Sequence, residues 1–255
     1  MNKTLYLAWQ DKRFHSNSLS GTRRWFPVGK LDKRNNEFEF SYIQGASRAE
    51  REAGFKPLAS FPDLHKTYRS SELFELFKNR VPRNNRTDFP TLLKRLDLTD
   101  SKADPVSILA ISGGFRQTDN LEAFPKLVKN PDNSFSCRFF LRGWRYMSES
   151  SQERLTHLQS GETLQVALEL NNPATGLAIQ LQTADHYQMI GWTPQYLVND
   201  LVKAIGLSHT DLTAQVVQVN QPPAPENQRV LVSLSGKFPE SYQPMESADF
   251  KPIAD

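Results

Sequence analysis

The sequence has a single cysteine, Cys137, among its 255 residues. One thiol cannot form an intrachain disulfide framework, nor can it supply a cluster of thiolates for zinc. The chain also lacks any run of about 18 apolar residues, which a membrane-spanning helix requires. Its first residues, MNKTLYLAWQ, do not show the charged and then apolar pattern of a signal peptide. We therefore expect a cytoplasmic protein that makes no use of a membrane.

Motifs of catalysis and of cofactor binding are also missing. The five histidines show neither H-E-x-x-H nor H-x-H spacing, and no G-x-S-x-G segment occurs. Gly113 and Gly114 follow an apolar run without forming G-x-G-x-x-G or G-K-[ST], so we interpret them as a turn between strands. Asp119 and Glu122 have no further residues of a nuclease or metal centre near them, and we interpret them as a solvated loop. The sequence thus predicts a non-enzymatic protein with no metal and no cofactor.

The residues that are abundant favour β-structure. The chain has 16 prolines and 16 phenylalanines, and long helical periodicities are scarce. Alternating or short apolar runs have the pattern of strands. They predict strands at 5–9, 25–31, 38–42, 106–111, 136–147, 164–170, 177–181, 189–192, 214–219 and 230–234. The polar residues 11–24 are expected to form a long loop.

Short helices are expected between these strands. Capping residues and apolar stripes predict them at 47–53, 70–77, 87–96 and 194–205. The fold class is therefore mainly β with short helices, in two small domains. The charged segment 99–104 has no large apolar residue, so we place the boundary there and predict domains at 1–102 and 103–236. Residues 237–255, rich in proline and aromatics, would be a tail that packs on a surface or is partly disordered.

Charge is distributed unevenly along the chain. Residues 1–100 contain 19 Lys+Arg and 12 Asp+Glu, a balance of +7, whereas residues 101–255 contain 12 and 16, a balance of −4. The densest basic region surrounds the expected helices near 70–96, and its members are Lys78, Arg80, Arg83, Arg86, Lys94 and Arg95. Two interpretations are open: a solvated face, or a surface for phosphate or an acidic partner.

The segment 136–147 combines arginines with aromatic residues. In a regular strand, one face would carry Arg138, Phe140, Arg142, Trp144 and Tyr146. This pairing suits single-stranded nucleic acid, because bases stack on rings while arginine binds phosphate. The alternative is a barrel strand whose aromatic residues form the core and whose arginines flank it. If Gly143 marks a bulge, the register shifts and the faces exchange.

The order of motifs after this segment resembles a known module. A strand, the turn Asn172-Pro173, a second strand and then Ile190-Gly191-Trp192-x-Pro194 before a helix are similar to a HIRAN domain. The resemblance extends over about residues 105–235 and is clearest at 135–220. It implies a small OB- or SH3-like β-barrel. Such modules accompany helicase-like remodelling ATPases or nucleases and are implicated in binding DNA ends.

The resemblance also implies site residues. The family has a G-x-R-Y segment that helps to hold a nucleotide, and Gly143-Trp144-Arg145-Tyr146 matches it. The family's N-P-Y-D turn supplies a stacking ring and a carboxylate, but Ala174 and Thr175 replace them here, so the sequence leaves open whether a 3′ end is recognised. The candidate nucleic-acid-binding residues are Arg142, Trp144, Arg145, Tyr146 and Trp192.

The first domain carries a second resemblance. A short strand, the segment Val28-Gly29-Lys30-Leu31 and the F-x-F-x-Y pattern at 38–42 are similar to the N-terminal β-subdomain of HipA-type kinases. The kinase portion, with its phosphate loop and catalytic segment, is absent. This resemblance implies a scaffold that docks a partner, without phosphotransfer.

Two functions follow from these observations. The first is a non-catalytic DNA-binding accessory protein that acts in bacterial DNA repair, restriction or phage defence. The second is a protein–protein interaction module that docks or regulates a partner effector, as a HipA-like subunit or an antitoxin would, without binding nucleic acid. The sequence leaves the form of the nucleic acid and the oligomeric state open.

Overall fold

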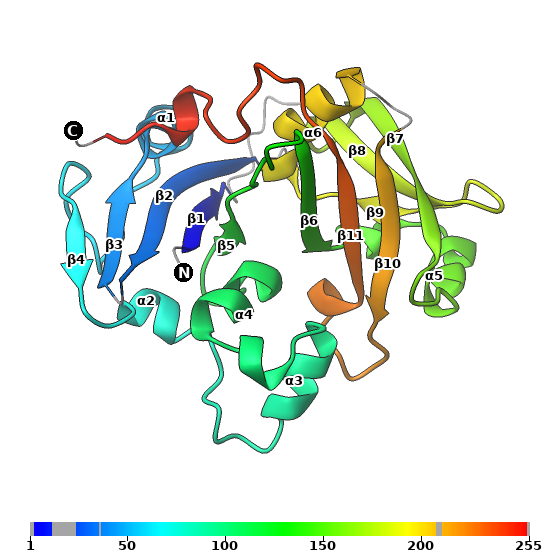
Figure 1. Ribbon diagram of the computed structural model, residues 1–255, viewed down its shortest axis with the longest axis horizontal. Helices are drawn as coiled ribbons and strands as arrows, with labels where there is room; N and C mark the ends of the chain where they lie inside the picture. Colours follow the sequence, from blue (N-terminus) through cyan, green and yellow to red (C-terminus); the bar gives the residue numbers. More distant parts are fainter. Residues whose placement is uncertain (1–2, 12–23, 36, 208–210, 254–255) are drawn as a thin grey trace. The chain divides into compact units, whose positions relative to one another are not determined.

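The computed structural model describes residues 3–11, 24–35, 37–207 and 211–253, and the chain forms two compact units (Figure 1). Unit 1 comprises Met1–Pro90, Thr99–Lys126 and Met245–Asp255. Unit 2 comprises Thr91–Leu98 and Leu127–Pro244. The boundary predicted after residue 102 is therefore corrected, because residues 103–126 belong to unit 1.

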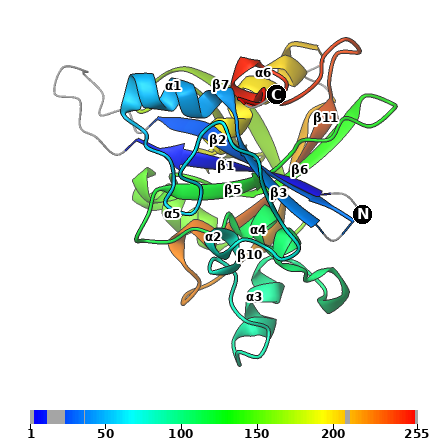
Figure 2. The ribbon, with the colours of Figure 1, turned by 90° about the vertical axis from the view of Figure 1, so that its left-hand side faces the viewer.

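Unit 1 is built on a five-stranded antiparallel sheet in the order β4-β3-β2-β1-β5. The strands are β1 (Lys3–Gln10), β2 (Trp25–Arg34), β3 (Glu37–Tyr42), β4 (Tyr68–Ser70) and β5 (Leu121–Pro125). Figure 2 shows β2, β1 and β5 side by side. The pairing of β5 with β1, from Leu5 opposite Pro125 to Trp9 opposite Leu121, holds residues 103–126 in unit 1. The strands predicted at 5–9, 25–31 and 38–42 are confirmed, whereas residues 12–23 of the predicted loop lie outside the described residues.

Three helices accompany this sheet: α1 (Gln44–Ala53), α2 (Glu75–Lys78) and α4 (Pro105–Ser112). Helix α1 ends at Gly54 as predicted, and it buries Ala46, Ala49 and Ala53. Helix α2 starts later than expected, because residues 68–70 pair with β3 as β4. A short 3-10 turn, η1 (Asp100–Lys102), precedes α4.

The strand predicted at 106–111 is wrong, because these residues form α4. The Asp104 carboxylate accepts a hydrogen bond from the Val106 backbone N–H at 3.2 Å, which caps the start of the helix. Pro105 suits the first turn, since its fixed φ is helical and it has no N–H to leave unpaired. Gly113, in the left-handed region at φ 71°, ends the helix. An apolar run of this length fits either a strand or a buried helix, and these caps decide in favour of the helix.

The last described residues pack onto unit 1. Arg48 donates two hydrogen bonds to the Asp249 carboxylate, at 2.9 and 2.6 Å, and Asp249 lies in the 3-10 turn η4 (Ala248–Phe250). The Phe250 ring meets the Tyr6 ring edge-on, with 4.7 Å between centroids. The described part of the predicted tail after residue 244 thus has a defined place against this sheet.

Unit 2 contains a six-stranded antiparallel sheet in the order β6-β11-β10-β7-β8-β9. Its strands are β6 (Ser134–Phe140), β7 (Thr163–Asn172), β8 (Gly176–Thr183), β9 (Met189–Trp192), β10 (Thr213–Val219) and β11 (Val230–Lys237). Its helices and 3-10 turns are α5 (Glu149–Thr156), α6 (Gln195–Leu207), η2 (Trp144–Tyr146) and η3 (Glu226–Gln228), and α3 (Phe89–Arg95) begins in unit 1 and ends in unit 2.

Most of the predicted elements of unit 2 are confirmed, including the strands from residue 164 onward and the helix predicted at 194–205, although α6 continues past Gly206 to Leu207. The strand predicted at 136–147 is wrong in its second half, because β6 ends at Phe140. Two backbone hydrogen bonds, both 2.9 Å, then join Arg142 to Trp192 at the end of β9. They bring the segment after β6 against the far edge strand of the sheet.

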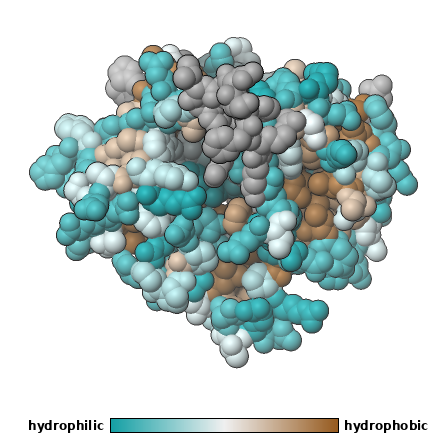
Figure 3. Space-filling view, turned by 180° about the vertical axis from the view of Figure 1, so that it is seen from behind, coloured by the Kyte–Doolittle hydropathy of each residue, from teal (hydrophilic) through white to brown (hydrophobic). Residues whose placement is uncertain are grey.

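The fold class is mainly β with short helices, as predicted. Seen from behind, hydrophilic residues cover most of the surface, and hydrophobic residues show in separate areas between them (Figure 3). Among the residues that the structure describes, no helix has both the length and the apolar character that crossing a bilayer requires.

Candidate nucleic-acid interface

A tight turn at Gly143 places the predicted G-x-R-Y segment on top of Trp192. Gly143 adopts φ 68°, a left-handed conformation that side chains disfavour, and η2 follows it directly. A methyl group at Gly143 would lie 2.5 Å from Cε3 of Trp192 and 2.6 Å from Cζ3. Only a glycine leaves room for this close approach. The turn therefore packs directly against the indole ring of Trp192.

Trp192 is fixed in turn by the β7–β8 hairpin. Its Nε1 donates to Oε2 of Glu169 at 2.6 Å, and Nδ2 of Asn172 donates to the same oxygen at 3.1 Å. Burial would raise the pKa of Glu169, but hydrogen bonds from Gln180, Trp192 and Asn172 outweigh it and lower the pKa. The carboxylate thus stays ionised and holds the ring in place.

Asn172 links this network to the predicted Asn-Pro turn. Its Oδ1 accepts hydrogen bonds from the backbone N–H groups of Ala174, at 2.9 Å, and Thr175, at 3.1 Å. Gly176 completes the turn at φ 75°. The turn therefore has a structural role here, because Asn172 is buried and directs its side chain toward Glu169.

Trp144 stands beside the turn with its ring half-buried. Its Nε1 donates to the carbonyl oxygen of Glu226 in η3, at 2.8 Å. The guanidinium of Arg229 lies over the ring, 5.6 Å from its centroid. The indole is thus held between the turn and the 220–229 loop, with a cation against its face.

Arg145 and Tyr146 form the exposed part of the site. The Arg145 guanidinium lies over the Tyr146 ring, 4.9 Å from its centroid, and Nη2 donates to the Tyr146 hydroxyl at 2.8 Å. Its Nη1 forms an ion pair with Oε2 of Glu226 at 3.1 Å. Hydrogen bonds to Tyr146 and Glu226 raise the pKa of Arg145, so the cation is permanent. The Tyr146 side chain is 66% exposed and offers an aromatic surface beside a fixed positive charge.

Helix α5 keeps this turn rigid. The Gln152 side chain donates to the carbonyl oxygens of Arg145, at 3.2 Å, and Met147, at 2.9 Å. Ser148 caps the helix, and its Oγ accepts a hydrogen bond from the Ser151 N–H at 3.2 Å. The two exposed side chains are therefore presented on an ordered support.

The structure brings together the five predicted nucleic-acid-binding residues, though not as one face of a strand. Arg142 and Trp192 meet through their backbones, and Trp144, Arg145 and Tyr146 form η2. Arg138 is separate from them, since its guanidinium bonds to the carbonyl oxygen of Leu96 and to Asp97. The predicted register beyond Phe140 is wrong because the left-handed Gly143 interrupts the extended backbone.

The predicted basic surface divides into several parts. Arg80 is not at the surface: its side chain is 1% exposed and bonds to the carbonyls of Leu76 and Gly114 and to Asp119. Asp119 lies in a loop, as interpreted, but it is half-buried and pairs with Arg80. The interpretation of Glu122 as a solvated loop residue is wrong, because Glu122 lies in β5 and is buried.

The other cations of this region are mostly exposed, and two of them form ion pairs. Lys78 lies 3.4 Å from Glu72 and 3.5 Å from Glu75, and Arg86 lies 2.8 Å from Asp88. Arg83 is exposed in unit 1, whereas Lys94, which is exposed, and Arg95, which is half-buried, lie in unit 2. The six residues therefore do not form one continuous feature of either unit.

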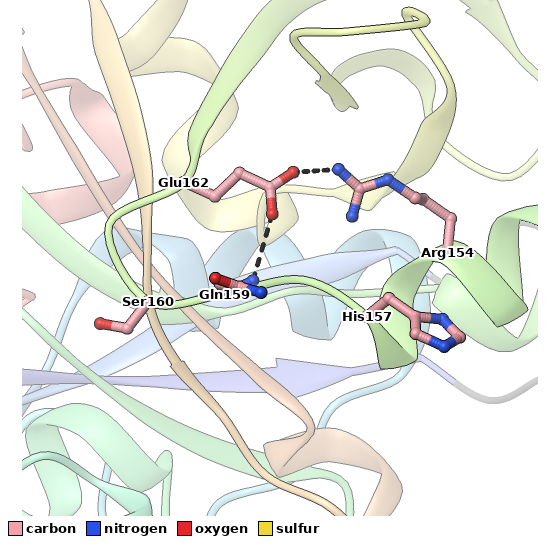
Figure 4. A pocket seen from close by; sticks show the side chains of 5 residues that line it. All are labelled: Arg154, His157, Gln159, Ser160 and Glu162. Carbon is pink, nitrogen blue, oxygen red and sulfur yellow. Dashed lines mark hydrogen bonds and ion pairs between the residues drawn. The ribbon is translucent and has the colours of Figure 1, made fainter.

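An open pocket of about 420 Å³ lies at the far end of α5 (Figure 4). Arg154, His157, Gln159, Ser160 and Glu162 line it. Arg154 and Glu162 turn toward each other as an ion pair, and Arg154 also lies 3.3 Å from Asp185. Because two carboxylates already neutralise its arginine, the pocket offers a ligand no free charge from Arg154.

Several residues of the site carry no signal in the sequence. Glu226 and Arg229 come from the proline-rich 220–229 loop, and Glu169 and Gln152 come from different elements. Glu169 lies 23 positions from Trp192 in the sequence, and Glu226 lies 82 positions from Trp144, so no local pattern marks them as partners.

Other chemically reactive groups lie outside the site. Cys137 takes no part, since it is buried, and burial raises its pKa to about 12. Among the described residues, no three His, Cys, Asp or Glu side chains gather to hold a metal ion.

Comparison with known proteins adds little to this description. No family model matches the chain, and no curated protein matches it. A crystal structure of a protein from Lactobacillus plantarum is similar at 17% identity, and the alignment covers 42% of this chain and 99% of the other. Its TM-score is 0.31.

Proposed function

We propose that the protein is a non-catalytic accessory protein that binds DNA through the surface formed by Gly143–Tyr146. The observation that carries this proposal is the pair of Arg145 and Tyr146. The Tyr146 ring is mostly exposed, and the Arg145 guanidinium is held beside it. Proteins bind single-stranded nucleic acid with this combination, because a base stacks on the ring and the arginine binds a phosphate.

The chemistry of binding follows from the arrangement. An unpaired base stacks on Tyr146, and the phosphate next to it approaches Arg145. Stacking on an aromatic side chain is worth about 1–3 kcal/mol per base. Trp144 and Trp192 support the turn, because their indole N–H groups are already used within the protein. Since stacking needs a base that is free of its neighbours, we propose a single strand in preference to duplex DNA.

Charge limits the expected strength of binding. Unit 2 contains 10 Lys+Arg and 11 Asp+Glu, a balance of −1. The positive charge near the turn comes from Arg142, Arg145 and Arg229. With few phosphate contacts available, we expect weak binding that falls as salt rises.

The resemblances of the sequence supply the setting of the proposal. Unit 2 would be a HIRAN-like barrel, and unit 1 a HipA-like scaffold that docks a partner. The protein would then act in the cytoplasm, in bacterial DNA repair, restriction or phage defence, together with a partner that supplies the enzymatic activity.

The second candidate function is a protein–protein interaction module. It is favoured by apolar side chains at the surface of unit 2: Leu168 is 43% exposed, Leu170 is 68% exposed and Tyr187 is 67% exposed. Such residues occur at protein interfaces, and the slightly negative balance of unit 2 does not oppose a protein partner.

A titration of labelled oligonucleotides followed by fluorescence anisotropy tests the proposal. The wild-type protein is compared with the double variant Arg145→Ala, Tyr146→Ala, starting near 50 mM salt, where phosphate contacts are strongest. We expect the double variant to lose about tenfold in affinity or more, since it lacks both a stacking ring and a charge. The matched control is Arg69→Ala with Tyr187→Ala, which removes the same residue types at exposed positions elsewhere, and Arg69, like Arg145, is paired with a glutamate.

The outcomes separate the two candidate functions. A loss in the double variant and no loss in the control support the site. Binding that survives in the double variant shows that the site is elsewhere. If the wild-type protein does not bind single-stranded or duplex DNA at 50 mM salt, the DNA proposal is wrong and the protein–protein candidate remains.

A further inference from the structure

The 220–229 loop, which connects β10 to β11, is fastened against the Gly143–Tyr146 turn. Asn220 closes the base of the loop, because its N–H donates to the Arg229 carbonyl and its Nδ2 to the Gln228 carbonyl, both at 2.7 Å. Gln221 donates to the carbonyl of Thr156, at the end of α5, at 3.1 Å. The loop therefore has a defined position over one side of the turn.

Glu226 makes two contacts to the turn from this position. Its carbonyl oxygen accepts the Trp144 indole N–H at 2.8 Å, and its carboxylate pairs with Nη1 of Arg145 at 3.1 Å. Both charged side chains remain more than half exposed, at 65% for Glu226 and 53% for Arg145. The ion pair is thus accessible to water and to a competing anion.

The position of the carboxylate matches what a ligand would need. Nη2 of Arg145 already donates to the Tyr146 hydroxyl, and Nη1 is the group that pairs with the carboxylate. A carboxylate oxygen and a phosphate oxygen are both anionic acceptors that a guanidinium binds in the same way. The ion pair therefore occupies the place beside the ring where the phosphate of a stacked nucleotide would bind.

We propose that Glu226 is an internal competitor for Arg145, which a nucleic-acid phosphate must displace, so that Glu226 sets the affinity and the salt dependence of the site. This inference rests on the proposed function. In the wild-type protein, the phosphate that pairs with Arg145 releases its condensed cation, but the displaced Glu226 carboxylate attracts a cation in turn, so the net release is small. Without the carboxylate, the release from the phosphate is not offset.

The variant Glu226→Gln isolates this effect. It removes the negative charge and keeps the side chain's size, and the hydrogen bond from the Trp144 indole N–H to the Glu226 backbone carbonyl does not depend on the carboxylate. The anchors at Asn220 and Gln221 also remain. The matched control is Glu149→Gln, an exposed acid in the first turn of α5.

Anisotropy titrations with a labelled oligothymidylate, at salt concentrations from 50 to 200 mM, give the test. We expect Glu226→Gln to bind about two- to fivefold more tightly than wild type at 50 mM salt, the range that an exposed ion pair gives. The plot of log affinity against log salt should steepen by up to about 0.7, the contribution of one phosphate contact on a single strand. Glu149→Gln should leave this slope unchanged.

Equal effects of the two variants, or an unchanged slope in Glu226→Gln, overturn the inference. Suppose that the wild-type protein binds, that the Arg145→Ala, Tyr146→Ala variant loses binding, and that Glu226→Gln binds with the wild-type affinity and slope. The proposed site is then supported, and the proposed role of Glu226 is refuted. If none of the proteins binds at 50 mM salt, the proposed function and this inference fail together.

Discussion

Replacing Gly143 with alanine should destabilise unit 2 by several kcal/mol and displace Trp192. Gly143 has φ 68°, and an alanine held in the left-handed region costs about 1–2 kcal/mol. The added methyl group would also lie 2.5 Å from Cε3 of Trp192, closer than non-bonded carbon atoms approach. Overpacking of this kind typically costs about 1–3 kcal/mol. The sum predicts a loss of about 2–5 kcal/mol.

The ring has little freedom to move away. Its Nε1 donates a hydrogen bond to Glu169 at 2.6 Å, and its backbone N–H and C=O are both hydrogen-bonded to the backbone of Arg142. Relief of the contact must therefore break one of these bonds or open the turn. Either change would also move Arg145 and Tyr146, so Gly143→Ala should weaken binding of a single-stranded oligonucleotide.

Urea unfolding followed by tryptophan fluorescence measures the loss. The replacements Trp9→Phe and Trp25→Phe, both in unit 1, would leave Trp144 and Trp192 of unit 2 as the source of the signal. The midpoint and slope of the transition then give the free energy of unfolding.

The variant Gly176→Ala provides a matched control. Gly176 also has a positive φ, at 75°, but an added methyl group would meet no atom within 4 Å. It should therefore show the backbone cost alone, about 1–2 kcal/mol. If Gly143→Ala and Gly176→Ala lose the same stability, the close seating of Trp192 under the turn is refuted.

Two further predictions concern residues on which the packing depends. Because hydrogen bonds lower the pKa of Glu169, its ionised form stabilises the folded state above about pH 4.5, and this stabilisation is lost as the pH falls through the lowered pKa. Glu169→Gln should lower the free energy of unfolding by about 1 kcal/mol near neutral pH, because it weakens the hydrogen bond from Trp192. It should also flatten the acid side of a plot of stability against pH. An unchanged plot would contradict the role of the carboxylate. Arg80→Ala should cost about 3–5 kcal/mol in thermal or urea unfolding, because it leaves Asp119 without its buried partner. The exposed Arg83→Ala should change stability by less than about 0.5 kcal/mol, and similar losses in both would contradict the burial of Arg80.

Elements that depend on local sequence were predictable. The β7–β8 hairpin follows from the alternation at 164–170 and 177–181 and from the Asn172-to-Gly176 turn between them. The end of helix α1 was predictable from Gly54, which terminates the helix in a left-handed conformation. In each case the pattern and the turn chemistry lie within a few residues of one another, so no distant contact is needed to decide the structure.

The sequence-based predictions are wrong where distant contacts, or helix-capping residues that the prediction did not take into account, decide the structure. Residues 106–111 are helical because Asp104 and Gly113 cap them, and these two residues were the available signal. The division into units depends on β5 pairing with β1, more than 110 residues earlier in the chain at Trp9 and Leu121. No local pattern encodes that pairing.

The candidate site shows the same division. Its central residues, Gly143 to Tyr146, could be selected from the sequence because glycine, cations and aromatics occur together there. The partners that position them, such as Glu226 and Glu169, lie on other elements and carry no motif. The sequence therefore indicates which groups form the site, and the structure indicates which of their atoms remain accessible.

A titration of the isotope-labelled protein with single-stranded DNA, followed by the four tryptophan indole N–H signals in NMR spectra, tests the central claim most directly. Trp144 bonds to the 220–229 loop beside the proposed site, whereas Trp9 and Trp25 lie in unit 1. We predict that the Trp144 signal and the backbone signals of residues 143–147 shift with DNA concentration, while those of Trp9 and Trp25 do not. Shifts confined to unit 1, or no shift at any DNA concentration, would contradict the account.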